Sequence, residues 1–233
     1  TGQRDSIATY SVRSGFDLLL QALDLKPGDE ILFSALNVRA MVKVVNQLGL
    51  VPVPIDIDLQ TMGPQIDKLK QAITPRSKVF VAAHLFGSRI DLTPSFAFAK
   101  SQGLVVVEDC AQAFNGRNYL GSPLADVVMY SFGPIKTSTA LGGGLLRVLD
   151  APLRERMRAI QARYPIQPEQ QQRKRILKFL TLKCVTSPTA LGAIYRYYRM
   201  RGQNYEDSLA NKVRDVAPLS TVEKMRMQCS ATL

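Results

Sequence analysis

Two hydrophobic patterns alternate along the first 150 residues. Continuous apolar runs predict strands, and apolar residues at helical spacing predict helices. Because proline cannot donate a hydrogen bond to a neighbouring strand, Pro52 and Pro54 indicate that their strand lies at an edge of the sheet. Strands alternating with helices are typical of an α/β fold, with a mostly parallel sheet covered by helices on both faces. The predicted strands are 30–33, 51–55, 78–83, 104–107, 127–131 and 145–148, and the predicted helices are 14–23, 38–48, 66–73 and 93–102.

After residue 150 the pattern becomes helical throughout, and the charge changes with it. Helical spacing predicts helices over 153–163, 173–185 and 188–201. The net charge of +11 is unevenly distributed: residues 1–150 hold 14 Lys and Arg against 13 Asp and Glu, whereas residues 151–233 hold 16 against 6. This shift predicts a large α/β domain over 1–150 and a basic helical region over 151–233.

The basic helical region has three interpretations. Its Lys and Arg side chains can form the solvated faces of helices that pack on the large domain. They can also form a surface for anionic partners, either diphosphate substrates or a partner subunit. In the third interpretation, residues 173–201 contact a membrane surface weakly, because apolar and cationic side chains are mixed there. Nucleic-acid binding is not expected, because no recognisable motif accompanies the charge.

Composition narrows the class of protein. The hydrophobic content of 46% and the charged content of 21% are ordinary for a globular protein with a substantial core. Three scattered cysteines and a single histidine, His84, predict neither a disulfide framework nor a metal site. The cysteine usage predicts a cytoplasmic location. The first residues carry no signal-peptide pattern, and no apolar run reaches the length of a membrane-spanning helix.

A carboxylate and a lysine suggest a specific cofactor. Asp109 closes an apolar run at the end of a predicted strand, and Lys136 lies in a turn between Ser131 and the glycines at 142–144. Pyridoxal phosphate needs a lysine amine for its aldehyde, a carboxylate for its ring nitrogen, and hydroxyls and backbone N–H groups for its phosphate. In a parallel sheet, ligands bind beyond the carboxyl ends of strands, where these residues fall. Each residue also has an ordinary interpretation, Asp109 as a helix cap and Lys136 as a solvated loop lysine.

Several motifs then occur in order along the chain. They are Ser14-Gly15, residues 25–32, 49–58 and 72–78, His84-Leu-Phe-Gly, Glu108-Asp-Cys-Ala-Gln-Ala, Ser131-Phe-x-x-x-Lys136 and Gly143-Gly144. Over roughly residues 10–165 the chain thereby resembles the DegT/DnrJ/EryC1/StrS aminotransferases, which are pyridoxal-phosphate enzymes of the aspartate-aminotransferase fold.

The resemblance implies a role for each candidate residue. Lys136 is expected to form the Schiff base with the cofactor, and Asp109 to pair with its ring nitrogen. Gln112 is expected beside the phenolic oxygen, and Val38 over the ring, where the family has an aromatic residue. The implied phosphate ligands are Ser14, Ser131 and the backbone at Gly15 and Phe16.

The implied reaction moves an amino group from an amino acid, usually glutamate, to a keto-sugar that is often nucleotide-linked. Family members are homodimers with active sites at the subunit interface, and a smaller C-terminal domain closes each site. Residues 151–233 do not resemble that domain closely, so we expect it to be truncated or divergent here.

The chain also departs from the family pattern, which keeps other functions open. Phe16 replaces a small hydroxylated residue, and Gly142 replaces an acidic one. The main alternative is a catalytically silent relative that acts as a binding or scaffold module, for instance at a membrane surface. A dehydratase of the same family is disfavoured, because that branch carries histidine in place of Lys136.

Overall fold

The computed structural model describes residues 5–133, 136, 138–185, 187–200 and 222–229. Its contacts divide the chain into two units. The first unit joins Thr1–Ile166 to Val222–Leu233, and the second is Gln167–Thr221. The first unit therefore extends past Asp150, and a domain boundary at that residue stays a prediction.

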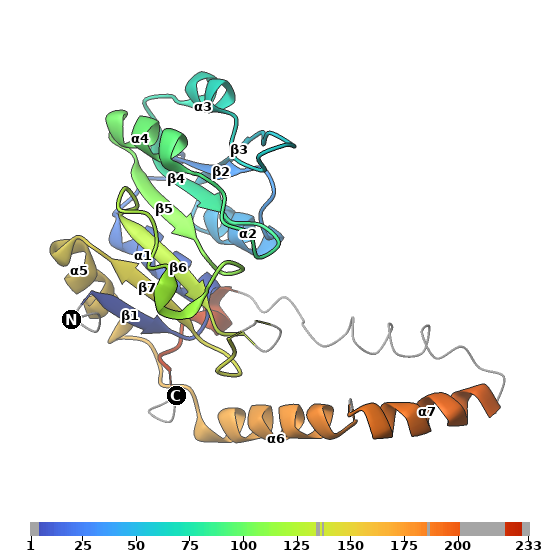
Figure 1. Ribbon diagram of the computed structural model, residues 1–233. Coiled ribbons are helices and arrows are strands. Elements are labelled where there is room, and N and C mark those ends of the chain that lie inside the picture. Colours follow the sequence, from blue (N-terminus) through green and yellow to red (C-terminus); the bar gives the residue numbers. More distant parts are fainter. Residues whose placement is uncertain (1–4, 134–135, 137, 186, 201–221, 230–233) are drawn as a thin grey trace. The chain divides into compact units, whose positions relative to one another are not determined.

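The first unit is built on a seven-stranded, mostly parallel sheet (Figure 1). The strand order is β1-β7-β6-β5-β4-β2-β3, and β7 runs antiparallel to both of its neighbours. β3 contains Pro52 and Pro54 and lies at an edge, as the sequence predicts. The strands are β1 (Ser6–Thr9), β2 (Glu30–Ser34), β3 (Val51–Ile55), β4 (Ser77–Ala83), β5 (Val105–Asp109), β6 (Val127–Ser131) and β7 (Gly144–Val148).

Two apolar clusters cover the two faces of this sheet, because side chains alternate between faces along each strand. Val79 and Val81 of β4 belong to the first cluster, whereas Phe80 and Ala82 belong to the second. The helices of the first cluster are α1 (Val12–Ala22), α2 (Arg39–Gln47) and α5 (Ala151–Gln161), and those of the second are α3 (Ile66–Ala72) and α4 (Thr93–Ser101). The predicted α/β fold, with helices on both faces, is confirmed.

Strand β1 is the element that the hydrophobic pattern does not predict. Ile7 is its one large apolar side chain, and it is buried in the first cluster. The strand pairs antiparallel with β7, far away in the sequence. Its existence therefore depends on a long-range partner and not on local periodicity.

The second unit contains two described helices, α6 (Glu169–Val185) and α7 (Pro188–Met200). They agree closely with the helices predicted over 173–185 and 188–201, although residue 201 lies outside the described residues. Among the described residues, no helix has both the length and the apolar character that crossing a membrane requires.

After the second unit, the chain returns to the first through a short 3-10 helix, η2 (Val222–Met225). The backbone N–H of Gln228 donates to the Pro165 carbonyl at 2.9 Å, and Ile166 pairs with Gln228. Arg226 donates two hydrogen bonds of 2.9 Å to the carboxylate of Asp17 in α1. The segments on both sides of the second unit are thus held together within the first.

Candidate active site

The parallel strands end at one edge of the sheet, and most of the candidate residues follow these ends. Asp109 ends β5, and Ser131 ends β6. β1 runs in the same direction as β6, because both are antiparallel to β7. Gly144 of β7 pairs with Thr9 on one side and with Ser131 on the other, so the start of α1 lies at the same edge. This is the edge where open parallel sheets bind ligands.

Asp109 is a buried carboxylate, 5% exposed, on the face of the sheet that α1 covers, since it alternates with Val107 of the first cluster. Its Oδ1 accepts the N–H of Ala111 at 2.9 Å. Burial raises the pKa of Asp109, whereas the Ala111 hydrogen bond and the positive charge of Lys136 act in the opposite direction. A cationic group beside this carboxylate would offset the cost of burying its charge.

Lys136 lies in the loop between β6 and β7. The Phe132 N–H donates to the Gly143 carbonyl at 3.2 Å, which holds the two ends of the loop together. Inside the loop, the Lys136 N–H donates to the Gly133 carbonyl at 3.1 Å and closes a turn. The charge of Lys136 acts on Asp109, so the two predicted catalytic residues lie within electrostatic reach of each other.

Ser131 and Lys136 both lie close to Gly133. A Cβ atom at Gly133 would lie 3.8 Å from Ser131 Oγ and 3.9 Å from Lys136 Cγ. Ser131 is half-buried, and it shares a face of the sheet with Asp109 because it alternates with Met129 of the first cluster. The structure therefore brings Asp109, Ser131 and Lys136 together.

The other predicted phosphate ligands lie at the start of α1. Ser11 and Ser14 form a reciprocal capping box: Ser11 Oγ accepts the Ser14 N–H at 3.1 Å, and Ser14 Oγ accepts the Ser11 N–H at 2.8 Å. The Gly15 N–H donates to the Ser11 carbonyl at 2.9 Å. Phe16 is fully buried and packs edge-on against Phe33, with ring centroids 6.0 Å apart. Ser14 and Phe16 thus have structural roles, and their contacts with a phosphate stay predictions.

Two glycines allow α1 to approach the sheet closely. A Cβ atom at Gly144 would lie 2.6 Å from the backbone nitrogen of Val12, and one at Gly15 would lie 2.2 Å from Leu146 Cδ1. Either side chain would push the first turn of α1 away from β7. Gly15, whose backbone is an implied phosphate ligand, therefore also has a steric reason to be glycine.

Gln112 lies on the loop after β5 and is exposed. Its Oε1 accepts the backbone N–H of Phe86 at 3.0 Å, which links this loop to the one after β4. Its amide nitrogen is the donor that the predicted contact with a phenolic oxygen would use. Phe86 was not singled out from the sequence; its side chain is 80% exposed and its φ is +55°.

Val38 lies farther along the same edge, in the loop after β2. It is the N-terminal cap of α2, and its side chain is 60% exposed. β4 separates β2 from β5, so Val38 and Asp109 follow strands that are not neighbours. The contact of Val38 with a cofactor ring stays a prediction.

Glu108 is a buried acid within an apolar strand. That position is a signal in the sequence, but the sequence predicts no role for it. Its side chain lies on the face opposite that of Asp109 and is 0% exposed. The carboxylate accepts hydrogen bonds from His84 Nε2 at 2.7 Å, from the Tyr119 hydroxyl and from the Ser122 N–H at 2.6 Å. Burial opposes the ionisation of Glu108, but these hydrogen bonds hold its pKa below the usual value. Glu108 therefore links the segment after β4 to the segment between β5 and β6.

His84, Glu108 and Cys110 place potential metal-ligating atoms within 4.8 Å of one another. His84 Nδ1 accepts the Ile90 N–H at 3.1 Å, so the hydrogen of the neutral ring lies on Nε2 and faces Glu108. Burial, together with the charges of Glu108 and Asp109, raises the pKa of the Cys110 thiol. Both ring nitrogens of His84 and both carboxylate oxygens of Glu108 already have hydrogen-bond partners, so these two side chains form a hydrogen-bond network.

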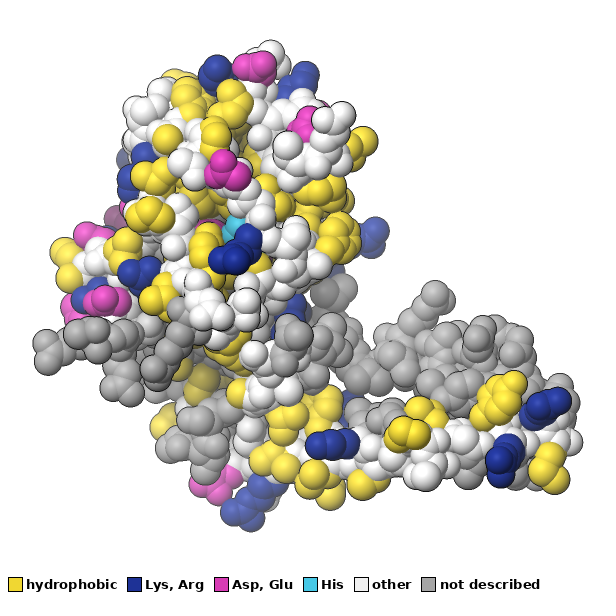
Figure 2. Space-filling model, viewed as in Figure 1, with side chains coloured by type: hydrophobic (Ala, Val, Ile, Leu, Met, Phe, Trp, Pro, Cys, Tyr) yellow, Lys and Arg dark blue, Asp and Glu magenta, His cyan; other side chains and the backbone are white. Residues whose placement is uncertain are grey.

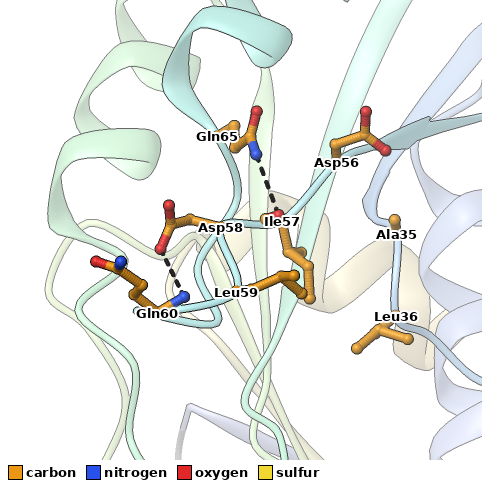
Figure 3. A pocket seen from close by; sticks show the side chains of 8 residues that line it. All are labelled: Ala35, Leu36, Asp56, Ile57, Asp58, Leu59, Gln60 and Gln65. Carbon is orange, nitrogen blue, oxygen red and sulfur yellow. Dashed lines mark hydrogen bonds between the residues drawn. The ribbon is translucent and has the colours of Figure 1, made fainter.

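An open pocket of about 730 Å³ lies at the ends of β2 and β3 (Figure 3). Two of its side chains are carboxylates, and Asp58 accepts the Gln60 N–H at 2.9 Å. None of the predicted site residues lines it, and its acids disfavour a phosphate. Its lining residues are Ala35, Leu36, Asp56, Ile57, Asp58, Leu59, Gln60 and Gln65.

The edge around Asp109 therefore offers an acid, an amine and a hydroxyl, next to the N-terminus of α1. A helix N-terminus favours an anion, whereas the buried carboxylate favours a cation. Chemically, this arrangement suits a ligand with a positive charge at one end and a phosphate at the other.

Comparison with known proteins gives a consistent result. The model of the DegT/DnrJ/EryC1/StrS aminotransferase family matches residues 1–187. The chain is 36% identical over 165 residues to UDP-N-acetyl-3-dehydro-alpha-D-glucosamine 3-aminotransferase of Acidithiobacillus ferrooxidans. That match covers 69% of this chain and 44% of the relative, so the chain spans less than half the length of that protein.

Two solved structures with similar folds are an aminotransferase and a protein with the bound cofactor PMP. The aminotransferase TlmJ from Streptoalloteichus hindustanus matches with a TM-score of 0.64 and 27% identity, over 70% of this chain and 45% of that one. The protein ntda from Bacillus subtilis, with bound cofactor PMP, matches with a TM-score of 0.62 and 32% identity, over 69% and 37%.

Proposed function

The chain belongs to the DegT/DnrJ/EryC1/StrS aminotransferase family, and from this premise we propose that the protein transfers an amino group from an amino acid to the carbonyl group of a sugar. Aminotransferases of this family use pyridoxal 5′-phosphate. The observation that carries the proposal is the meeting of a buried carboxylate, Asp109, with Lys136 and Ser131 at one edge of the sheet.

The residues at this edge fit the cofactor. Asp109 is buried with a raised pKa, and a protonated ring nitrogen beside it would stabilise its ionised form. When bound, the cofactor supplies an electron-poor ring that stabilises negative charge on the substrate carbon. Lys136 would hold the cofactor through Nζ and, once released, move a proton at that carbon. Ser131 and the start of α1 would orient the phosphate.

The proposal also names the amino donor and the carbonyl acceptor of the reaction. We expect glutamate as the donor, as is usual in the family. The printed name of the Acidithiobacillus ferrooxidans relative describes a UDP-linked keto-sugar, which supports a nucleotide-linked keto-sugar as the acceptor here.

We also expect a homodimer, as in the family. Large apolar side chains are exposed around the candidate site, which supports a subunit contact there; they are Leu36, Val38 and Phe86. A cytoplasmic location and weak contact of residues 173–201 with a membrane surface stay separate predictions.

Borohydride trapping tests the proposal directly. Folded protein is incubated with pyridoxal 5′-phosphate, reduced with borohydride and digested, and the modified peptide is identified by mass spectrometry. We expect the modification on Lys136 and its loss in Lys136→Ala, whereas Lys43→Ala, at an exposed lysine of α2, should behave like the wild type.

Folded protein without modification of Lys136 would refute the proposal and favour the alternative of a silent binding or scaffold module. Unreduced protein with bound pyridoxal 5′-phosphate should in addition form an amino-sugar from glutamate and a UDP-linked keto-sugar. Conversion of glutamate without any sugar product would refute the proposed acceptor.

A further inference from the structure

The second unit is an insertion in the chain of the first. Residues before it and after it are paired with each other, through Ile166 and Gln228, and the returning segment is held on α1 by Arg226 and Asp17. The segments that flank the insertion are therefore joined within the first unit, and the described contacts that join them do not involve α6 or α7.

The two helices carry an excess of positive charge. Together α6 and α7 contain seven Lys and Arg against one acid, Glu169. Arg173 forms an exposed ion pair with Glu169 at 3.3 Å. A surface of this kind attracts an anionic partner over the distance of a Debye length.

Apolar side chains lie beside these charges and are exposed. Ile176, Leu177 and Leu180 of α6 are 39%, 65% and 55% exposed. With 3.6 residues per turn they share one side of the helix with Arg173 and Lys183. Lys174 and Lys178 project from the other side. Exposing these apolar side chains to water is unfavourable, so their grouping predicts a partner that covers them.

Helix α7 repeats this mixture. Tyr195 and Met200 are 53% and 87% exposed, and Arg196 and Arg199 are exposed beside them. Figure 2 shows yellow apolar and dark blue cationic side chains along these helices. Tyrosine is a typical residue of membrane–water interfaces, because one end of its ring is apolar and the other is polar.

We propose that α6 and α7 bind the surface of an anionic phospholipid bilayer. Ile176, Leu177 and Leu180 enter the boundary between head groups and acyl chains, and the Lys and Arg side chains contact lipid phosphates. Charge complementarity selects anionic lipid, and the exposed aliphatic stripe separates this partner from a nucleic acid, to which aliphatic side chains offer little. The helices lie on the bilayer and do not cross it, since neither is long and apolar enough.

A single tryptophan makes a clean reporter, because the chain has none of its own. Leu177→Trp, in the complete chain, is titrated with phosphatidylcholine vesicles with and without phosphatidylglycerol. We expect a blue shift of its fluorescence, and quenching by brominated acyl chains, only when phosphatidylglycerol is present. The matched control is Leu59→Trp, at a position of the first unit that is 82% exposed and should show neither change.

Charge variants measure the electrostatic part. Each Lys or Arg near an anionic surface strengthens binding about fivefold. Arg173→Gln with Lys183→Gln, on the same side of α6 as the apolar residues, should therefore weaken binding about 25-fold. The control pair, Lys43→Gln with Lys68→Gln, removes the same charge from exposed lysines of the first unit and should change binding less than about twofold.

Three results would overturn the proposal. The first is an unshifted Leu177→Trp spectrum on phosphatidylglycerol vesicles, and the second is an equal loss of binding in both charge pairs. The third is a wild type that binds no vesicles but self-associates, together with loss of that self-association in the double variant Leu177→Ser, Leu180→Ser. That result would assign the exposed apolar side chains to a contact between copies of the chain. These measurements need no cofactor, so their outcome is independent of the aminotransferase proposal.

Discussion

Replacing Arg226 with methionine should destabilise the first unit, although Arg226 follows the whole insertion in sequence. Its guanidinium donates from Nε and Nη2 to the two carboxylate oxygens of Asp17, both at 2.9 Å. Asp17 is 0% exposed, so the variant leaves a carboxylate buried without its cationic partner. Methionine keeps most of the aliphatic volume, and the loss is therefore mainly electrostatic.

The size of the loss follows from this environment. Removing one partner of a buried ion pair costs about 3–5 kcal/mol. The Arg226 side chain is 33% exposed, and Gln21 Nε2 still donates to Asp17 at 2.6 Å. Both facts favour the lower end, about 3 kcal/mol in the free energy of unfolding. In a domain of this size, that change lowers Tm by about 6–12 °C.

Thermal unfolding followed by circular dichroism at 222 nm measures this loss. Arg158→Met is the control, since Arg158 pairs with Glu155 on an exposed helix face and should lose no more than about 0.5 kcal/mol. Adding Asp17→Asn to Arg226→Met removes the unpaired charge and should recover part of the stability. Equal midpoints for the two arginine variants, or no recovery in the double variant, would refute the reasoning.

Three further predictions concern groups near the candidate site. Because burial raises the pKa of Asp109, its ionised form destabilises the fold at pH 7. Asp109→Asn should therefore raise the Tm of the protein without cofactor. The same variant should weaken pyridoxal-phosphate binding, measured by absorbance titration, by at least about tenfold (about 1.4 kcal/mol). The pKa of the Glu108 carboxyl is lowered from an ordinary 4.5. Ionised Glu108 therefore stabilises the folded protein above pH 4.5, and this stabilisation is lost as the pH falls through the lower pKa of the folded state. The urea midpoint of the wild type should fall over that pH range, and the midpoint of Glu108→Gln should change less. Ellman's reagent should label exposed Cys184 in the folded chain, and buried Cys110 only after denaturation. Mass spectrometry locates the label, and rapid labelling of Cys110 in folded protein would contradict its burial and raised pKa.

Local patterns in the sequence predicted most of the sheet. The apolar run before Asp109 and the strand over 127–131 lie where the pattern indicates, and the prolines of β3 marked an edge. These strands can be predicted from the sequence, because a strand buried between two layers of helices requires a continuous apolar run. The meeting of Asp109 and Lys136 at one edge could also be predicted, since parallel strands bring their carboxyl ends together.

Long-range partners could not be predicted in this way. Glu108 gave a local signal, an acid within an apolar strand, but its three donors come from positions 84, 119 and 122. The family resemblance implies a phosphate contact for Gly15, whereas the lack of space for a Cβ atom there depends on how α1 lies on β7. The Arg226–Asp17 pair spans 209 residues, and no periodicity encodes it.

The pairing of Ile166 with Gln228 has a consequence for how this protein can vary. Two chain segments that already meet can accept loops of very different lengths between them, because each doubling of loop length costs only about 0.6 kcal/mol of closure entropy. Residues 167–221 therefore occupy a position that can be lengthened, shortened or exchanged while the sheet keeps its strand order. Relatives of this chain can be expected to differ most in length at this junction, and a foreign domain grafted there should leave the sheet unit able to fold.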